Sequence, residues 1–241
     1  GSQQAITDGG ILPGVLEIGS TIAQTPSLRD RGLVGYWTFD EGSGTTAYDR
    51  SGKGNNGTLT NSPTWQTGSN CKRGNCLSFV GGASNQYVNC GANLQITSSQ
   101  YTVSGWVKIP STAPDSTRHA FVRMGSSYPS FCPSFSNTQK PLMYLNGSNY
   151  RYGSSDVRNN QWSFFSFVVV GNQISDVLNA KIYLNGVIES AWATSIGATP
   201  IVPDGSCSIG SEYFDGFVDD IRIYNRALSE REILSIYNST K

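Results

Sequence analysis

One carboxylate in this sequence occupies a position where a charge is hard to accommodate, in the middle of an apolar strand. The strand predicted over residues 217–224 alternates with period two, and its apolar face would carry Phe217, Ile221 and Ile223. Asp219 falls on this same face. A buried carboxylate is costly unless a cation or several hydrogen-bond donors meet it. Asp219 therefore predicts either a cation site or a carboxylate that caps buried backbone amides.

A second acidic residue, Asp40, opens a long stretch of oxygen-rich loops. It ends the strand predicted over residues 32–40, and residues 41–57 that follow are dense in Gly, Ser, Thr, Asn and Asp. Such loops offer carboxylates and backbone carbonyls together, which are the ligands that a hard cation such as Ca²⁺ requires. The alternative is turn formation alone, with Asp40 beginning a local Asx turn.

The sequence contains five cysteines, which is an odd number. Cys71 and Cys76 enclose a four-residue turn and predict a local disulfide, with two free thiols as the alternative, because a metal knuckle would need a second close pair. Cys132 and Cys207 are candidates for a second bridge, although sequence alone does not fix connectivity. Cys90 alternates with apolar residues and is expected to be a small buried hydrophobe and not a nucleophile. A disulfide favours an extracytoplasmic location.

The bulk composition excludes several classes of partner. The 17 basic and 17 acidic residues give a net charge of zero, so no basic field attracts nucleic acid or an anionic membrane surface. No apolar run is long enough to insert this fragment across a bilayer. The chain has 241 residues with 27 Gly, and it shows no long amphipathic helical pattern before its C-terminal end. This composition is typical of many short strands joined by turns.

The chain divides into an arm and a domain. Residues 1–2, Gly-Ser, are typical of a cloning remnant. Residues 3–30 hold Gly-Gly, proline and scattered single aliphatic residues without a sustained period. We expect an extended N-terminal arm or linker over residues 1–30 and one domain over residues 31–241.

Short apolar segments dominate the predicted domain. The first strand would place Leu33, Trp37 and Phe39 on one face. Further strands are predicted at residues 76–80, 86–90, 101–109, 119–124, 142–145, 162–170, 180–184, 206–210 and 217–224. Asn146-Gly147 and Asn185-Gly186 predict hairpin turns. Many short strands without helices between them indicate an all-β sandwich or barrel.

A short helix is predicted at the C-terminal end. Ser229 with Glu232 three residues later forms a capping-box pattern, which marks a helix start. Ile233, Ile236 and Tyr237 follow at helical spacing and predict a packing face.

Several of these segments together resemble a laminin-G-like domain of the concanavalin A-like lectin/glucanase superfamily. The motifs that carry the resemblance are residues 32–40 (GLVGYWTFD), 49–57 (DRSGKGNNG), 77–79 with 87–88, 103–107, 182–186 and 218–228 (VDDIRIYNRAL). The resemblance covers residues 32–238 and implies a two-sheet antiparallel jelly-roll sandwich whose first and last strands lie close together. Domains of this family commonly hold a structural calcium ion. They often serve as binding modules on secreted or surface proteins, so the resemblance implies both for this chain.

Carried over to this sequence, the resemblance implies one Ca²⁺ site. Asp40 and Asp219 would meet at the ion, and backbone carbonyls around Asn56 and Gly57 would complete its coordination. Calcium takes about six to eight oxygens, so two carboxylates do not suffice alone. The capping alternative for Asp219 and the Asx-turn alternative for Asp40 stay open.

The sequence indicates no catalytic machinery. Some relatives in the superfamily are glycoside hydrolases, which need two carboxylates that face a cleft. The Glu-x-Asp-x-x-Glu run of one such family is absent, and the adjacent Asp219 and Asp220 would point to opposite faces of a strand. His119 is the single histidine and is predicted at the surface. No nucleophile elbow, P-loop or zinc-spaced set occurs, so we expect a domain that is not an enzyme.

Aromatic residues in polar loops are the candidate ligand contacts, because a ring offers apolar area to a sugar at little entropic cost. The candidates are Tyr128, Tyr144, Tyr150, Tyr152 and Trp192, with Asn146 as a hydrogen-bonding neighbour. Two functions stay open: a lectin-like module that binds glycans, and an adhesive or structural domain, for example on a pilus-like or envelope protein, that binds a cell-surface protein. With either function, we expect the chain to be part of a larger extracellular or cell-surface protein. A polysaccharide hydrolase or lyase is a third, weaker alternative.

Overall fold

The computed structural model describes residues 30–97, 99–113, 119–125, 132–135, 140–146, 149–171, 176, 179–190, 192–193, 202–211 and 213–241. The predicted arm over residues 1–30 lies outside them apart from Asp30, and so does Tyr128.

The larger layer is an eight-stranded antiparallel sheet, here called sheet A, whose order is β15-β14-β13-β7-β18-β5-β4, with β1 also paired to β18. Its strands are β1 Leu33–Trp37, β4 Thr64–Thr67, β5 Asn75–Phe79, β7 Gln100–Lys108, β13 Trp162–Val170, β14 Lys181–Leu184, β15 Val187–Ile188 and β18 Gly216–Tyr224. Two short 3₁₀ helices, Gly68–Asn70 and Gly82–Ser84, precede β5 and β6. The pairing of β1 with β18 confirms that the first and last strands are neighbours.

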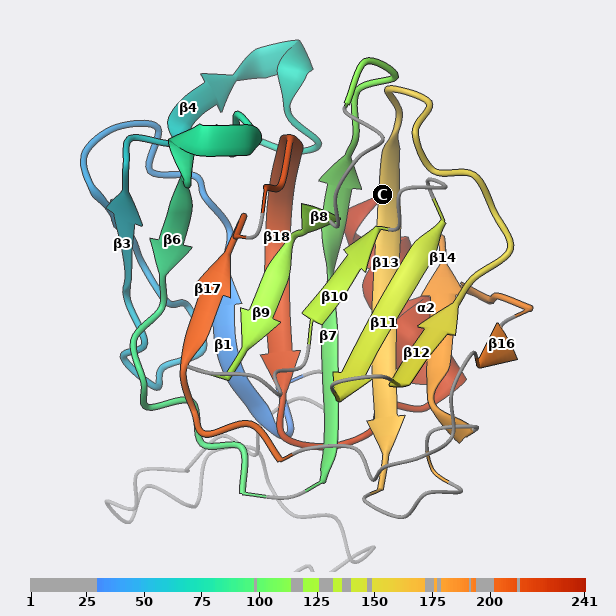
Figure 1. Ribbon diagram of the computed structural model, residues 1–241. Coiled ribbons are helices and arrows are strands. Elements are labelled where there is room, and N and C mark those ends of the chain that lie inside the picture. The colour runs from blue at the N-terminus through green and yellow to red at the C-terminus, as the bar shows by residue number, and fades with distance from the viewer. Residues whose placement is uncertain are drawn as a thin grey trace, which may run out of the picture.

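The second layer consists of two five-stranded antiparallel sheets. Sheet B has the order β2-β3-β6-β17-β9, with β2 Thr46–Ala47, β3 Gly57–Thr60, β6 Tyr87–Asn89, β17 Cys207–Ile209 and β9 Val122–Met124. Sheet C has the order β16-β12-β11-β10-β8, with β16 Trp192–Ala193, β12 Asn149–Tyr152, β11 Pro141–Asn146, β10 Cys132–Phe135 and β8 His119–Ala120. The strands of both lie side by side in front of sheet A (Figure 1). The predicted antiparallel sandwich is confirmed.

The main core fills the space between the two layers. Sheet A contributes rings and branched side chains from its inner face, and the second layer contributes Val88, Val122, Met143 and Ile209. The sheet A residues are Val34, Trp37, Leu77, Phe79, Tyr101, Val103, Val107, Phe165, Phe167, Val169, Ile182, Val218, Ile221 and Ile223. Burial of this apolar surface is the main force that holds the two layers together.

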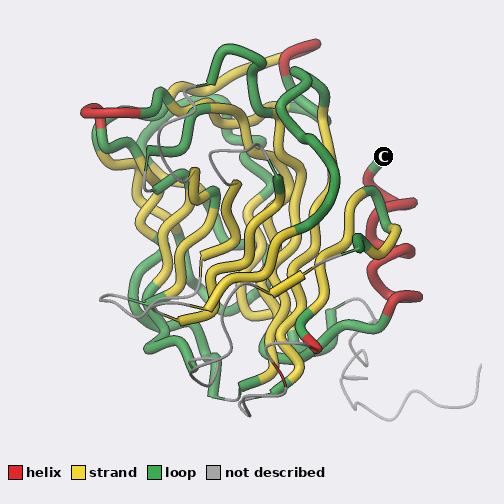
Figure 2. The backbone as a smooth tube through the Cα atoms, turned by 45° about the vertical axis from the view of Figure 1, so that its right-hand side comes forward, coloured by secondary structure: helices red, strands yellow, loops and turns green. Residues whose placement is uncertain are grey.

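A helix covers part of the other face of sheet A. Helix α2, Glu230–Thr240, begins with the predicted capping box, and Ile233 and Ile236 on its inner side are buried. The Tyr237 ring lies 5.7 Å from that of Trp106, and Trp106 Nε1 donates to Thr240 Oγ1 at 2.9 Å. Figure 2 shows the helix outside the strands, on the side away from the second layer.

Among the residues that the structure describes, no helix has both the length and the apolar character needed to cross a bilayer.

The predicted face of Asp219 is wrong. Ile221 and Ile223 lie in the main core, but Phe217 points to the outer face of sheet A, where its ring lies 6.4 Å from that of Trp162. The register between β18 and β7 shifts between Asp219 and Arg222, and Asp220 adopts a φ of 53°. This β-bulge inserts one extra residue and reverses the alternation on its far side.

The predicted face of the first strand fails for a related reason. The pairing of β1 with β18 shifts register between Leu33 and Gly35. Trp37 and Phe39 lie in the main core, whereas Leu33 packs with Trp106 and Tyr224 beneath helix α2. Strict alternation therefore does not hold across either irregularity.

Loss of the helix cap tests the role of the capping box. Replacing Ser229 by alanine removes the oxygen that accepts from the Glu232 N–H. We expect the free energy of unfolding, measured by chemical denaturation, to fall by about 1 kcal/mol. Ser235→Ala in the same helix is the control, and an equal loss in both variants would argue against the cap.

Candidate functional site

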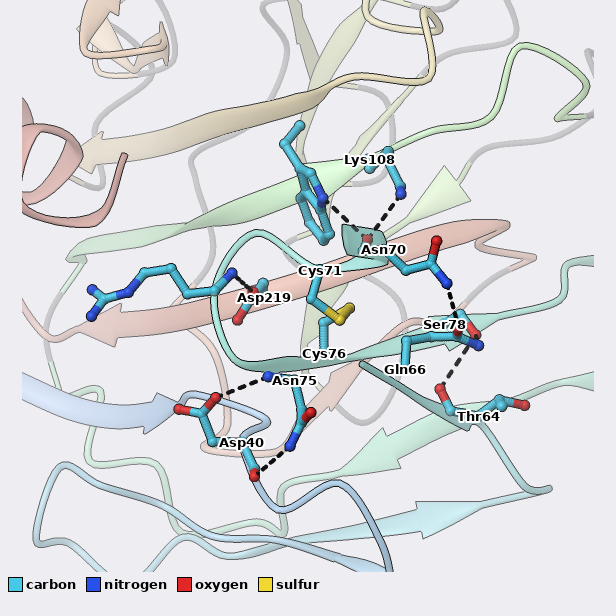
Figure 3. The surroundings of a disulfide bond; sticks show 12 residues. Asp40, Thr64, Gln66, Asn70, Cys71, Asn75, Cys76, Ser78, Lys108 and Asp219 are labelled. Carbon is cyan, nitrogen blue, oxygen red and sulfur yellow. Dashed lines mark hydrogen bonds between the residues drawn. A yellow bond between two sulfur atoms is a disulfide. The ribbon is translucent and has the colours of Figure 1, made fainter. Parts of the chain in front are cut away.

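Asp40 and Asp219, the two acidic residues predicted to share a site, both bind the segment beside residues 219–220 of β18, which neither β5 nor β1 pairs. Strand β5 pairs with the first part of β18, where Val218 lies opposite Leu77, and β1 pairs with the last part, where Ile221 lies opposite Trp37. The bulge at residues 219–220 falls between these two partners. Asp40 follows the end of β1, so the strand order places it on the same side of β18 as Asp219, and each binds one end of segment 73–75 (Figure 3).

Asp40 is bound to the start of β5. Its Oδ1 accepts from the Asn75 N–H at 3.1 Å, and its backbone oxygen accepts from Asn75 Nδ2 at 2.9 Å. Gly74 has a φ of 51°, and a Cβ atom there would lie 2.0 Å from Asp40 Oδ1. This position therefore needs glycine both for its backbone and for the close approach of the carboxylate.

Asp219 binds the other end of the same segment. The residue is 1% exposed, and its Oδ2 accepts from the Arg73 N–H at 3.0 Å. Burial raises the pKa of Asp219 to about 8, the Arg73 amide opposes this shift, and the negative charges of Asp220 and Asp40 add to it. The contact with the Arg73 amide is the one that the amide-capping alternative predicts. A cation between Asp219 and Asp40 would relieve the repulsion between their negative charges.

The segment held by the two carboxylates is the loop of the predicted disulfide. Cys71 and Cys76 are bonded, with their Cα atoms 5.4 Å apart, which confirms the pairing. The loop is also fastened to the outer face of sheet A. Lys72 Nζ lies 4.0 Å from the centre of the Trp106 ring, and Lys108 Nζ donates to the Asn70 backbone oxygen at 2.9 Å.

Asp220 is neutralised by different partners. The Tyr36 hydroxyl donates to its Oδ1 at 2.6 Å, and Arg222 Nη2 lies 3.3 Å from the same oxygen. Burial raises the pKa of Tyr36, and the nearby Asp220 charge and hydrogen bond add to this, while Arg222 opposes it. The expectation that Asp219 and Asp220 point to opposite faces is wrong, because the bulge lets both reach partners on the outer face of sheet A.

The loops after Asp40 are organised by Asp49. Its carboxylate accepts from the Tyr36, Ser51 and Asn55 amides at 2.8–2.9 Å. Asn56, predicted near the ion, uses Oδ1 to accept from the Asp49 N–H at 3.0 Å.

Gly57, the other backbone contributor predicted for the ion, begins β3 opposite Ala47. Within the described residues no group of three or more His, Cys, Asp or Glu side chains could hold a metal. An ion between Asp40 and Asp219 would therefore take its remaining ligands from carbonyls or water, and the four-residue calcium site stays a prediction.

The predicted ligand-binding aromatic residues lie on neighbouring strands of sheet C. Tyr144 on β11 pairs with Tyr150 on β12, and Tyr152 on β12 pairs with Trp192 on β16. We call these four positions the aromatic ladder. Asn146 pairs with Asn149 at the hairpin end of the same two strands, as Asn146-Gly147 predicts. For these residues the structure describes the backbone position only, except for Tyr152, whose side chain is half-buried.

A clamp fixes the turn that follows the aromatic ladder. Glu189, just after β15 of sheet A, accepts through Oε2 from the Ser154 and Ser155 amides at 2.9 and 3.0 Å. Its Oε1 accepts from the Ser155 hydroxyl at 2.7 Å. These donors lower the pKa of Glu189 despite its partial burial, which opposes the shift. The turn after Tyr152 is thereby tied to the edge of the other layer.

Residues 81–234 match the family model described as the concanavalin A-like lectin/glucanases superfamily. The chain belongs to this superfamily. The resemblance seen in the sequence motifs is thus confirmed, and no curated protein sequence matches the chain.

Solved structures share this superfamily fold. Domain 4 of AbnA, a GH43 extracellular arabinanase from Geobacillus stearothermophilus solved in complex with arabinotriose, matches 85% of this chain and 98% of its own, with 20% identity and a TM-score of 0.61. Trypanosoma rangeli sialidase matches 86% of this chain with 17% identity and a TM-score of 0.61, and this chain spans 33% of that enzyme. The binding domain of Paraclostridial Mosquitocidal Protein 1 matches 88% of this chain and 53% of its own, with 16% identity and a TM-score of 0.52.

Several residues of the site in this superfamily member were not found from sequence. Arg73 acts through its backbone amide, which gives no side-chain signal, and Asn75 acts through its backbone amide and its Nδ2 group. Glu189 is isolated in the sequence from the serines that it binds. The one available signal was Gly74 inside the short Cys-x₄-Cys loop, since glycine in a disulfide loop often marks a backbone conformation with positive φ.

A glycine pair tests the close approach at Asp40. Gly74→Ala places a methyl group against the Asp40 carboxylate, whereas Gly54 has a similar positive φ and open space around it. Both variants carry backbone strain, but only Gly74→Ala displaces Asp40. We expect its free energy of unfolding to fall by about 1–3 kcal/mol more than that of Gly54→Ala. Equal losses would show that Asp40 does not depend on Gly74.

The raised pKa of Asp219 predicts a pH dependence in the absence of metal. The folded pKa of about 8 exceeds the ordinary value of 3.8, so the folded state holds a proton that the unfolded state has released. This contribution to stability is complete below about pH 4 and is lost as the pH rises to about 8. In EDTA, we expect the melting temperature to fall between these pH values, and to fall less in Asp219→Asn. Parallel curves for both proteins would contradict the assignment.

Proposed function

We propose that this chain is a non-catalytic carbohydrate-binding module that binds glycan along the aromatic ladder of sheet C. The observation that carries the proposal is the register that brings Tyr144, Tyr150, Tyr152 and Trp192 to adjoining positions on three neighbouring strands. Four aromatic residues from separate parts of the sequence thus form one row. Aromatic rings are suited to stack on sugar rings, because they lose little conformational entropy on binding.

The polar residue between the two tyrosines of β12 faces away from the row. Arg151 lies between Tyr150 and Tyr152 on β12 and opposite Met143 of the core. Its Nε is buried and makes no hydrogen bond within the described residues, and burial lowers the pKa of its guanidinium. Because side chains alternate along a strand, Arg151 shares the face of core residue Met143 and not that of Tyr150 and Tyr152, so the proposal does not rest on it.

The superfamily fold supports the same class of ligand. Domain 4 of AbnA, which is matched over 98% of its own chain, was solved in complex with arabinotriose. Arabinan oligosaccharides are therefore the first probes for this chain.

The non-catalytic role rests on how the acidic residues are used. Asp40 and Asp219 hold backbone amides of the disulfide loop, and Asp220 is paired with Tyr36 and Arg222. Glycoside hydrolysis needs two carboxylates free to act on either side of a sugar bond. In our proposal, Asp40 and Asp219 instead hold a structural Ca²⁺, with carbonyls near Asn56 and Gly57 as further ligands. The Cys71–Cys76 disulfide supports an extracellular or cell-surface location.

Binding is tested with arabinotriose and a glycan array, using Tyr152→Ala as the variant and Tyr48→Ala as the control. Tyr48 is 50% exposed and lies outside sheet C. We expect Tyr152→Ala to weaken binding about tenfold or more, and Tyr48→Ala to leave it unchanged. An empty array together with a measured protein partner would favour the adhesive alternative. Release of reducing ends from polysaccharides would contradict the non-catalytic role.

The calcium proposal is tested separately by thermal melting. Returning Ca²⁺ after EDTA treatment should raise the melting temperature, because an ion that binds only the folded state stabilises it. The shift should be lost in Asp219→Asn. If the melting temperature of the unchanged protein did not shift, the calcium proposal would be contradicted and the glycan proposal would be unaffected.

A further inference from the structure

Two cysteines that the sequence does not pair lie side by side in sheet B. Cys90 follows β6 and Cys207 begins β17, and the register of Asn89 opposite Ser208 continues to place them opposite each other. The Cys90 N–H donates to the Cys207 backbone oxygen at 3.0 Å, so the two backbones remain paired at this point.

The two sulfur atoms are closer than separate thiols normally approach. Cys90 Sγ lies 2.8 Å from Cys207 Sγ, inside ordinary van der Waals contact between sulfurs. Residues directly opposite in an antiparallel pair have Cα atoms about 4.5–5.5 Å apart, and disulfides bridge Cα separations of about 4.4–6.8 Å. Only a small rotation of the side chains separates this arrangement from a covalent bond.

The surroundings argue against other roles for the pair. Both residues are buried, at 1% and 5% exposure, among the apolar side chains of the main core. Burial raises the pKa of the Cys90 thiol, with the neighbouring Cys207 adding to the shift. A nucleophile or metal ligand needs the thiolate, which this environment disfavours. No acidic or histidine side chain among the described residues joins them in a metal-binding group.

We propose that Cys90 and Cys207 are joined by a second disulfide when the protein folds in an oxidising compartment. Two S–H bonds break, one S–S bond forms, and two protons and two electrons leave the pair. The electrons pass to a disulfide-bonded thiol oxidoreductase or to a small-molecule disulfide, which is reduced to two thiols. Because both sulfurs are buried in the folded protein, the exchange takes place before the core closes.

The bond would connect distant parts of the chain at the middle of sheet B. The two cysteines are 117 positions apart, and β17 lies between β6 and β9. The bridge would therefore fix β17, which joins strands β2, β3 and β6 on one side of sheet B to β9 on the other. A crosslink that closes so long a loop strongly restricts the unfolded chain. This inference does not depend on the glycan proposal.

Thiol counting tests the bond directly. Protein folded in an oxidising compartment is denatured without reductant, alkylated, digested and analysed by mass spectrometry. We expect a linked peptide pair that contains Cys90 and Cys207, two hydrogens lighter than the sum of the reduced peptides, and alkylation of Cys132. Alkylation of Cys90 and Cys207, or a linked peptide that joins Cys132 to either of them, would overturn the proposal.

A stability measurement provides the second test. In the double variant Cys90→Ala/Cys207→Ala, we expect the melting temperature to fall by roughly 5–15 °C under oxidising conditions. Part of this loss would come from the missing sulfur atoms. Each protein is therefore also reduced while denatured and refolded, and its melting temperature is measured again in reductant. Reductant should lower the melting temperature of the Cys132→Ala control more than that of the double variant, since the double variant retains only Cys71–Cys76. Equal reductant effects would contradict the bond.

Discussion

Two adjacent carboxylates at the centre of a sheet determine how this part of the molecule is built. Asp219 and Asp220 are 1% and 4% exposed, and each needs donors that a regular ladder does not supply. The bulge turns both to the outer face of sheet A. One then takes an amide from the disulfide loop, and the other takes Tyr36 and Arg222. The same bulge marks where β18 changes partner from β5 to β1. The change of strand partner, the disulfide loop and the acidic site thus come together at one local irregularity.

Local signals in the sequence identified most elements of the fold. The strand over residues 162–170 is the length predicted, the Asn185-Gly186 turn joins β14 to β15, and Ser229 caps the final helix. Side-chain faces in β1 and β18 were predicted wrongly, because a bulge adds a residue without changing composition. The segment 119–124 was predicted as one strand but divides between sheets C and B. Which sheet a short strand joins depends on contacts with distant segments, and periodicity does not record them.

The site shows the same division between local and distant information. The family resemblance, which encodes the strand order, predicted a shared site for Asp40 and Asp219, and the structure shows them holding the two ends of one short segment. Their partners Arg73 and Asn75 each donate a backbone N–H, which any residue type supplies, and only Asn75 adds a side-chain donor. Aromatic candidates were visible as residue types in polar loops. Their arrangement as a row needed the register of β11, β12 and β16, which is set by hairpin geometry and by tertiary pairing.

The register of β1 on β18 has a mechanical consequence. Leu33, at the start of β1, lies opposite Tyr224, at the end of β18, so the flanking segments leave this pair from the same end. A pulling force applied through those segments would load the hydrogen bonds between the strands one after another and not all together. Helix α2, which follows β18, would detach from Trp106 and Phe164 before the strands began to separate. Resistance to tension would then come from side-chain packing under the helix, while the second layer would stay outside the path of the force.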